Sequence, residues 1–207
     1  MPSRGRFITL EGGEGAGKST QARHLAAHLA ARGRPVLLTR EPGGAPGAEA
    51  MRRVLLAGAG LDPVAEALLV FAARRDHLVA TIGPALAAGM WVVCDRFADS
   101  SRAYQGHAQG VRASTIESLA WIALEGQAPD LTLVLDLPVE LGLARARQRG
   151  VAADRYERLD AGFHARVRQG FRAIAAAEPG RCALLDAAGP AESLAARIAT
   201  LVDDRLP

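Results

Sequence analysis

The segment that most constrains this chain is residues 12–19, which read Gly-Gly-Glu-Gly-Ala-Gly-Lys-Ser and match the pattern G-x-x-x-x-G-K-[ST] in full. The segment follows an apolar run and precedes a helical pattern, which is the context expected of a phosphate-binding loop (P-loop). Its glycines let backbone N–H groups turn inward around phosphates, and the positive end of the following helix adds attraction. The pattern therefore predicts a strand, a loop and a helix that together bind a nucleoside triphosphate.

Lys18 is the only lysine among the 25 Lys and Arg residues, so the chain uses arginine wherever a general positive charge is enough. A compact ammonium on a thin stem fits between the β- and γ-phosphates, where a planar guanidinium is too wide. The hydroxyl of Ser19 is expected to bind Mg²⁺. We expect the whole loop to bind ATP, through Gly12, Gly13, Glu14, Gly15, Ala16, Gly17, Lys18, Ser19 and Thr20.

The composition predicts a single globular domain over residues 1–207, with 49% hydrophobic and 23% charged residues. The net charge of +3 comes without a lysine-rich run or interleaved aromatic and basic residues, so nucleic acid is not an expected partner. The longest uncharged run, 78–94, contains Gly83 and Pro84, which argues against a membrane span. Cys94 and Cys182 lie far apart in apolar runs and are expected to be reduced, as in a cytoplasmic protein.

Five short apolar runs are expected to form buried parallel strands, because they are continuously hydrophobic rather than alternating. These runs are 6–11, 35–40, 90–95, 131–137 and 182–186. Segments with helical spacing separate them, and Pro138 is expected to open one of these helices. Strands that alternate with helices predict an α/β fold of the P-loop NTPase type, in three layers, with a five-stranded parallel sheet flanked by helices.

Polar residues stand where four of these runs stop: Glu11, Arg40 with Glu41, Asp95 with Arg96, and Asp136. Ligands of parallel sheets bind beyond the carboxyl ends of the strands, so the chemistry is expected along this edge. Asp95 is placed to orient Mg²⁺ and its waters, while Arg96 can hold a phosphate bidentately. The alternative is an ordinary surface ion pair, and Asp136 is a rival for the metal role that periodicity cannot exclude.

Each of three further segments has a functional and a purely structural interpretation. A charged pair entering the glycine-rich turn at 40–44, with Arg52 soon after it, favours a ligand loop over an ordinary turn. Phe71 and Arg75 share a helix face and can contact a nucleobase, although an aromatic on such a helix is otherwise a core residue. The arginine cluster at about 145–158 surrounds a glycine-bearing loop, which predicts a mobile lid; the alternative is a solvated helix face.

Taken together, these segments resemble the thymidylate kinase family over almost the full chain. The P-loop alone is generic, whereas the combination in this order and spacing is specific. The matching segments are Glu-Gly-Gly-Glu-Gly-Ala-Gly-Lys-Ser-Thr from Glu11, Arg-Glu-Pro-Gly-Gly from Arg40, Phe-Ala-Ala-Arg-Arg from Phe71, Asp-Arg-Phe from Asp95, Ala-Tyr-Gln-Gly from Ala103, and Asp154-Arg155 with Glu157.

The resemblance implies that the chain phosphorylates dTMP to dTDP with Mg²⁺ and ATP, and that it forms a homodimer. It implies that Phe71 stacks on thymine, that Arg75 donates to its O4, and that Tyr104 excludes a ribose 2′-hydroxyl. The other residues implied to bind the acceptor are Glu41, Arg52, Arg96, Ser101 and Gln105, the two arginines holding its phosphate. The residues implied to act in catalysis are Lys18, Arg96, Glu14, Arg149 and Arg155, with Glu14 near the 3′-hydroxyl and the metal.

Two departures from the family pattern refine these roles. Gly15 stands where some members carry an arginine, which implies the bacterial type, in which the lid supplies that charge through Arg149 or Arg155. Ser101 stands where some relatives have Asn or Thr, so its place in the acceptor site does not imply a contact with the base.

Two other functions are compatible with a P-loop. A kinase for another nucleotide differs only in its acceptor, and Arg52 with Arg96 favours a phosphorylated acceptor over a nucleoside. A non-catalytic nucleotide switch predicts exposed switch segments and slow hydrolysis, whereas a lid and a second phosphate clamp imply a small-molecule acceptor. Whether ATP turnover depends on added dTMP separates these functions.

Overall fold

A computed structural model describes residues 4–57, 60–148 and 155–206. The central part of the predicted lid, including Arg149, lies outside these residues.

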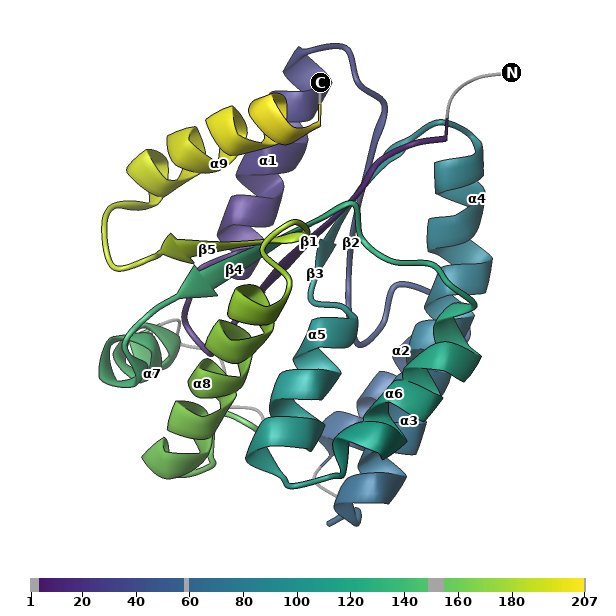
Figure 1. Cartoon of the computed structure of the whole chain (residues 1–207), viewed down its shortest axis with the longest axis vertical. Helices are drawn as coiled ribbons and strands as arrows, with labels where there is room; N and C mark the ends of the chain where they lie inside the picture. Colours follow the sequence, from purple (N-terminus) through teal and green to yellow (C-terminus); the bar gives the residue numbers. More distant parts are fainter. Residues whose placement is uncertain (1–3, 58–59, 149–154, 207) are drawn as a thin grey trace.

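Five strands form one parallel sheet, as the apolar runs predict (Figure 1). They are β1 (Phe7–Gly12), β2 (Val36–Arg40), β3 (Trp91–Asp95), β4 (Leu131–Asp136) and β5 (Cys182–Asp186), in the spatial order β2-β3-β1-β4-β5. β1 is central, because Thr9 pairs in register with both Cys94 of β3 and Thr132 of β4. The P-loop, which follows β1, therefore lies at the middle of the carboxyl edge of the sheet.

Helices cover both faces of the sheet and complete the predicted three layers (Figure 1). They are α1 (Lys18–Ala31), α2 (Pro46–Leu56), α3 (Pro63–His77), α4 (Gly83–Ala87), α5 (Ala98–Ser101), α6 (Ala113–Leu124), α7 (Val139–Gln148), α8 (Ala161–Ala177) and α9 (Ala191–Arg205), with two π-helical turns, η1 (Leu78–Ile82) and η2 (Arg102–Ala108). Successive residues of β1 point to opposite faces. Ile8 packs with Leu25 of α1 and Ile198 of α9, whereas Phe7 packs with Ile82 of η1 on the other face.

Local sequence signals set several helix ends. α3 begins after Asp62, whose carboxylate accepts hydrogen bonds from the backbone N–H groups of Val64 and Ala65 and so caps the helix. Pro138 directly precedes α7 rather than opening it, and its carbonyl accepts a hydrogen bond from the N–H of Gly142 at 3.0 Å. Within the described residues, every helix is too short or too polar to cross a membrane.

Candidate active site

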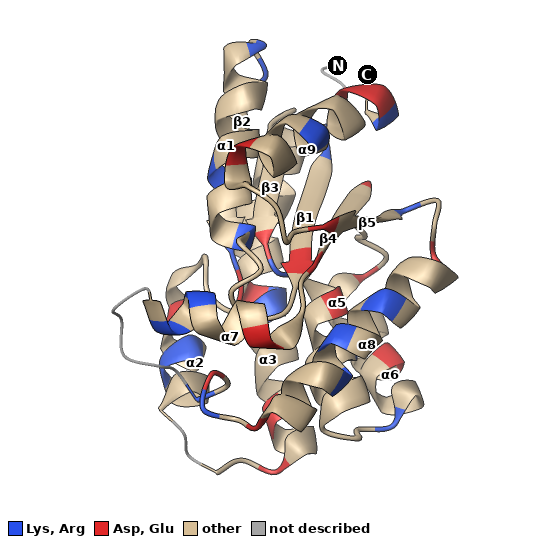
Figure 2. Cartoon of the chain, turned by 90° about the vertical axis from the view of Figure 1, so that its left-hand side faces the viewer, with Lys and Arg blue, Asp and Glu red and all other residues tan. Residues whose placement is uncertain are grey.

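A cavity of about 770 Å³ lies at the carboxyl edge of the sheet, where charged residues of both signs gather (Figure 2). The predicted site residues that line it are Glu14, Gly15, Ala16, Gly17, Lys18, Ser19, Thr20, Glu41, Arg52, Asp95, Arg96, Ser101, Tyr104 and Gln105. Of the other predicted site residues that the structure describes, none lines the cavity: these are Gly12, Gly13, Phe71, Arg75 and Arg155.

The P-loop wraps the first turn of α1, and Lys18 is the first residue of that helix. Gly15 and Gly17 have φ angles of 68° and 90°, which favour glycine because other residues are strained there. The Lys18 ammonium donates a hydrogen bond to the carbonyl of Gly13 at 2.7 Å. Burial, followed by Arg96, lowers the pKa of this ammonium from its usual 10.5 to about 8. A bound phosphate would offset the loss of hydration that causes this shift.

Gly15 approaches α7 so closely that a side chain does not fit. A Cβ atom on Gly15 would lie 2.0 Å from the carbonyl oxygen of Gly142. A Cβ atom on Gly142 would in turn lie 2.3 Å from the carbonyl oxygen of Glu14. The two backbones therefore pack against each other, which gives a physical reason why no arginine stands at position 15. The contact also joins the P-loop to the helix that leads into the predicted lid.

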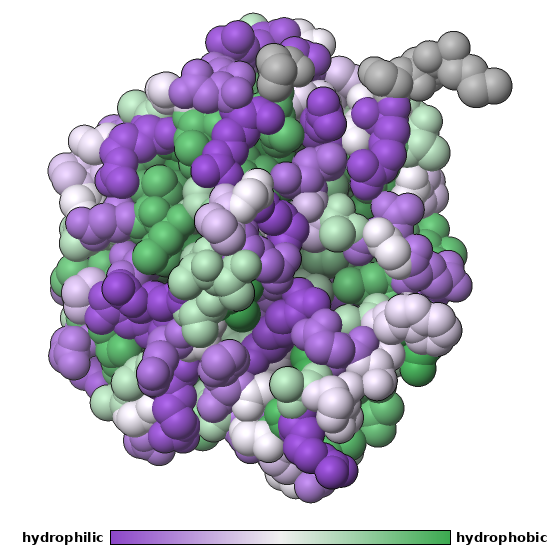
Figure 3. All heavy atoms as spheres, in the orientation of Figure 1, coloured by the Kyte–Doolittle hydropathy of each residue, from purple (hydrophilic) through white to green (hydrophobic). Residues whose placement is uncertain are grey.

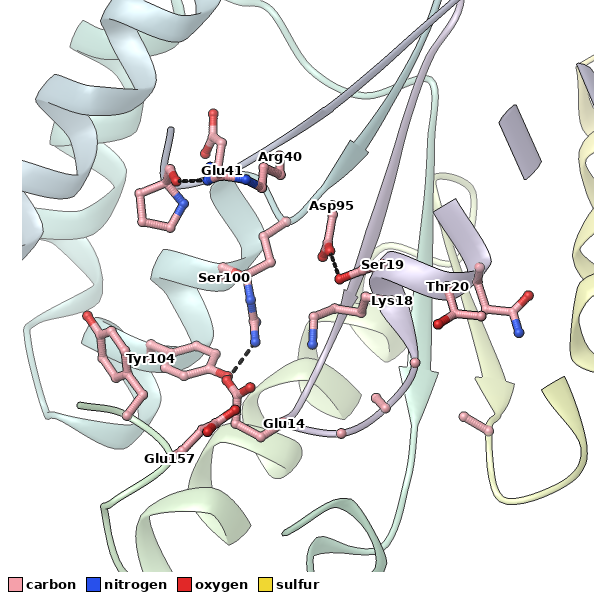
Figure 4. Close-up of a pocket in the computed structure, with 18 of the residues that line it drawn as sticks. Glu14, Lys18, Ser19, Thr20, Arg40, Glu41, Asp95, Ser100, Tyr104 and Glu157 are labelled. Atoms are coloured by element: carbon pink, nitrogen blue, oxygen red, sulfur yellow. Dashed lines mark hydrogen bonds and ion pairs between the residues drawn. The ribbon is translucent and has the colours of Figure 1, made fainter. Parts of the chain in front are cut away.

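Ser19 and Asp95 lie together at the end of β3, where the hydroxyl of Ser19 donates a hydrogen bond to Oδ2 of Asp95 (Figure 4). Oδ1 of Asp95 is buried and has no hydrogen-bond partner among the described residues. The rival Asp136 does not line the cavity, and Arg168 and Arg172 each approach it at 2.6 Å. A hydroxyl and a free carboxylate oxygen fit Mg²⁺, which binds few protein oxygens and completes its shell with water and phosphates.

Glu14, Arg96 and Tyr104 form one hydrogen-bonded group. Glu14 and Tyr104 lie near Lys18 in Figure 4. Oε1 of Glu14 accepts hydrogen bonds from Arg96 at 2.7 Å and from the Tyr104 hydroxyl at 2.8 Å. Burial opposes ionisation of Glu14, but Arg96 and Lys18 outweigh it and lower the pKa of the carboxyl from 4.5 to about 2. Arg96 itself has a φ of 73°, a conformation that is rare outside glycine and often found at functional sites.

Glu11, near the carboxyl end of β1, supports the loop that follows β3. Its Oε1 accepts a hydrogen bond from the backbone N–H of Phe97 at 2.8 Å, and its Oε2 accepts one from the Ser100 hydroxyl at 2.6 Å. Burial, together with the charge of Asp99, raises the pKa of the Glu11 carboxyl from 4.5 to about 7. The sequence signals only that Glu11 ends a strand, so this supporting role could not be predicted.

Glu41 connects the loop after β2 to α3. Its two oxygens accept hydrogen bonds from Arg74 at 2.7 Å and from Nδ1 of His77 at 3.1 Å. The peptide bond between Glu41 and Pro42 is cis, and Arg52 donates to the carbonyl of Pro42 at 2.8 Å. Glu41 and Arg52 both line the cavity, so this loop belongs to the site and is not an isolated surface turn.

The structure places Val70 and Arg74 at the cavity, one position before each of the two residues of α3 predicted to contact the base. Arg75 lies 2.9 Å from Glu125, after the end of α6, and does not line the cavity. Phe71 is 3% exposed and packs among apolar side chains of α3 and α6, as expected of a core residue. Val70 and Arg74 line the cavity instead. Successive residues of a helix are rotated by about 100° around its axis. Val70 and Arg74 therefore share one face, and Phe71 and Arg75 share another that points away from the cavity.

Arg74 has donors to spare in this position. Its side chain donates to Glu41, to the hydroxyl of Ser101 at 2.9 Å and to the carbonyl of Phe97 at 2.9 Å. A guanidinium carries five N–H donors, which is two more than these three acceptors use. Arg74 therefore offers a fixed, charged donor to a ligand in the cavity.

The described ends of the predicted lid differ in what they contact. Arg145, in α7, lines the cavity and donates to the carbonyls of Ala187 and Ala188 at 3.0 and 2.9 Å. These two contacts hold the guanidinium against the loop that follows β5.

At the other end of the predicted lid, Arg155 pairs with Glu66 of α3 at 2.5 Å. It does not line the cavity, so its predicted contact with the transferred phosphoryl group stays a prediction. The neighbouring Tyr156 and Glu157 do line the cavity, although the sequence patterns gave neither a role. Arg149, the other predicted lid arginine, lies outside the described residues.

One cavity thus joins a P-loop to a second region rich in arginine, and this arrangement defines a P-loop phosphotransferase with a phosphorylated acceptor. Residues 10–198 match the family described as Thymidylate kinase. The chain is 54% identical to the thymidylate kinase of Rhizorhabdus wittichii over 98% of this chain and 99% of that protein. It is 52% identical to the thymidylate kinase of Caulobacter vibrioides over 99% of both chains.

Among solved structures, the chain is similar to the thymidylate kinase of Ehrlichia chaffeensis, with a TM-score of 0.79 and 34% identity over 97% of this chain and 99% of that one. The chain belongs to the thymidylate kinase family and is a nucleoside monophosphate kinase.

Proposed function

We propose that this enzyme transfers the terminal phosphoryl group of ATP to dTMP and releases ADP and dTDP. The observation that carries this function is that Lys18, Arg52 and Arg96 all line one cavity, so donor and acceptor phosphates can meet there. Thymidylate kinases similar to this chain over almost its full length support dTMP as the acceptor. Such a transfer asks the protein mainly for positioning and charge neutralisation.

The donor half of the cavity is built on the P-loop. Backbone N–H groups of the loop and the start of α1 surround the donor phosphates, and Lys18 neutralises the β- and γ-phosphates. Arg145, fixed by the carbonyls of Ala187 and Ala188, offers a flat guanidinium face on which the adenine ring stacks. Lys18, with Arg96 beside it, is therefore the main source of positive charge for the transition state.

Ser19 and Asp95 would hold Mg²⁺ together with the donor phosphates. When bound, the metal draws negative charge away from the phosphate oxygens during transfer. Support for this assignment comes from the buried, unpartnered Oδ1 of Asp95. Asp136 is engaged by two arginines and has no such free oxygen facing the cavity.

The acceptor half positions the phosphate and sugar of dTMP. Arg52 and Arg96 hold the acceptor phosphate so that one of its oxygens can attack the γ-phosphorus. Glu14, kept ionised by Arg96 and Lys18, accepts a hydrogen bond from the 3′-hydroxyl. The ring of Tyr104 lies where a 2′-hydroxyl would clash, which favours deoxyribose.

The base is recognised by α3 and its neighbours. We assign the thymine O4 contact to Arg74, in place of Arg75, because Arg74 lines the cavity and has donors to spare. Val70 forms an aliphatic wall against the ring in place of the expected aromatic. Gln105 and Ser101 complete this region, with Ser101 holding Arg74 rather than touching the base.

We also propose that the enzyme is a homodimer that pairs through α3 and α6, which pack against each other (Figure 1). On the face drawn in Figure 3, hydrophobic and hydrophilic residues are mixed. Large apolar side chains on α3 and α6 are 42–80% exposed, namely Val64, Leu68, Trp121 and Ile122. Exposed apolar groups of this size on neighbouring helices favour a protein–protein contact.

The proposal further includes a single domain over residues 1–207 that acts in the cytoplasm. All strands of the described residues belong to one sheet, which supports a single domain. Cys94 and Cys182 are free and buried, and burial raises the pKa of each thiol. Unreactive, reduced cysteines fit a reducing compartment.

The direct test is ADP release by the purified enzyme with ATP, Mg²⁺ and a panel of acceptors: dTMP, dCMP, UMP, dGMP and thymidine. We expect dTMP to raise ATP turnover by far the most, and removal of Mg²⁺ with EDTA to abolish it until Mg²⁺ is restored. A preference for another monophosphate would mean that this nucleotide, and not dTMP, is the acceptor. Turnover that is indifferent to every acceptor would favour the nucleotide switch.

A further inference from the structure

Glu66 of α3 is fully buried, with 0% of its surface exposed, and donors from two distant parts of the chain meet on it. Gln105 of η2 and the nearby Gln109 both donate to its Oε1 at 2.8 Å. From the C-terminal end of the predicted lid, the Tyr156 hydroxyl donates to Oε1 at 2.7 Å, and Nη2 of Arg155 lies 2.5 Å from Oε2. Glu66 therefore ties α3, η2 and the segment 155–156 together.

A carboxylate in this position is costly, because burial removes its hydration and only close charges and hydrogen bonds offset that loss. An apolar side chain of similar volume would fill the same space without that cost. Unlike such a side chain, Glu66 accepts hydrogen bonds and an ion pair, and it thereby fixes the positions of the donor side chains.

The donors fixed by Glu66 lead directly to the cavity. Tyr156 and its neighbour Glu157 line it, and so does Gln105. The ring of Tyr156 packs edge-on against the ring of Tyr104, with centroids 5.4 Å apart and planes at 85°. Tyr104 is the proposed sugar contact, so this path of contacts runs from Glu66 into the acceptor half.

We propose that Glu66 is a positioning residue for acceptor binding. It anchors Arg155 and Tyr156 to α3, so that Tyr156 and Glu157 are held on the acceptor side of the cavity. Arg155 then serves as an anchor rather than as a contact to the transferred phosphoryl group. The inference rests on the proposed function only for the identity of the acceptor as dTMP.

The first experiment compares Glu66→Gln with Asp99→Asn. Asp99 is a matched control, because it is also buried, pairs with Arg181 at 2.7 Å and does not line the cavity. We expect Glu66→Gln to raise KM for dTMP about tenfold while KM for ATP stays within about twofold. Asp99→Asn should leave both KM values within about twofold, even if it lowers Tm as much. An unchanged KM for dTMP, or equal rises in both KM values, would overturn the inference.

A second variant tests the path through Tyr156. Tyr156→Phe removes one donor to Glu66 and keeps the ring, so KM for dTMP should rise by a smaller factor than in Glu66→Gln. Because both changes break the same anchor, the double variant should be no worse than Glu66→Gln alone. Effects that multiply in the double variant would contradict a shared role.

Hydrogen exchange of the backbone amides in residues 155–160 measures the anchor without any substrate. Exchange should be faster in Glu66→Gln than in the wild type or in Asp99→Asn. If exchange is faster in Glu66→Gln but the ATP turnover of the wild type does not depend on dTMP, the proposed function is refuted and the role of Glu66 as an anchor is retained. Unchanged exchange in Glu66→Gln would refute the anchor itself.

Discussion

The donor and acceptor halves of the cavity are encoded in different ways. On the donor half, one contiguous run, 12–20, supplies the loop, the lysine and the metal-binding hydroxyl. On the acceptor half, the lining residues come from the loops after β2 and β3, from α2, α3 and η2, and from the C-terminal end of the predicted lid. Covalent geometry fixes the relative positions within a short run, whereas a dispersed set depends on helix register and packing. A motif is therefore sufficient evidence for the first half and insufficient for the second.

The largest expected effect tests the donor half. Lys18→Arg keeps the charge but widens the cation, and we expect turnover to fall at least ~100-fold, or about 3 kcal/mol of lost transition-state stabilisation. The measurement is kcat for ATP and dTMP in a variant whose Tm matches the wild type. Arg32→Lys, at an exposed position at the opposite end of the same helix, is the control for an exchange between the two cations and should keep full activity. Near-normal kcat in Lys18→Arg would mean that the motif does not identify the donor site.

The next prediction, with a smaller expected effect, tests whether the donor half also depends on the contact between the P-loop and α7. Gly142→Ala places a Cβ 2.3 Å from the carbonyl of Glu14, so the P-loop has to shift. We expect kcat/KM for ATP to fall about tenfold, which corresponds to about 1.4 kcal/mol. Gly180→Ala is the control, because a Cβ there meets nothing within 4 Å. Equal activity in the two variants would show that the contact between the P-loop and α7 has no role.

The third prediction concerns Glu11, which holds the loop that carries residues of both halves. Its pKa is raised from 4.5 to about 7, so the folded state binds this proton more tightly than the unfolded state. The stability that Glu11 contributes is therefore fully present below pH 4.5 and is lost as the pH rises to about 7. The loss amounts to about 3 kcal/mol across this window.

Urea unfolding of the wild type and of Glu11→Gln at several pH values from 4.5 to 8 checks this sign. The difference in the free energy of unfolding, wild type minus variant, should fall as the pH rises and level off above pH 7. Glu192→Gln, at an exposed glutamate of α9, is the control for a general effect of losing one charge. A stability difference that grows as the pH rises would mean that folding lowers the pKa of Glu11 and does not raise it.

The sheet and its edge could be predicted, because continuous apolar runs mark buried strands and the residues after them mark the carboxyl edge. The π-helical turns η1 and η2 could not, because no pattern in the sequence distinguishes them from ordinary helix. Glu66 and Glu41 gain their roles from partners far away in sequence, which no local pattern reveals. Arg74 and Arg75 are adjacent and chemically identical, so only the helix register decides which of them faces the cavity.

The central claim, that α3 recognises the acceptor through Arg74, is tested most directly by kcat/KM for dTMP and dCMP in Arg74→Ala and Arg75→Ala. The ratio of the two values does not depend on the fraction of folded enzyme. Loss of a charged donor is worth roughly 1.5–3 kcal/mol, so Arg74→Ala should lower kcat/KM for dTMP about ten- to a hundredfold and narrow the preference over dCMP. Arg75→Ala should leave both values within about twofold. The opposite outcome, with the preference lost only in Arg75→Ala, would contradict the account and restore Arg75 to the base site.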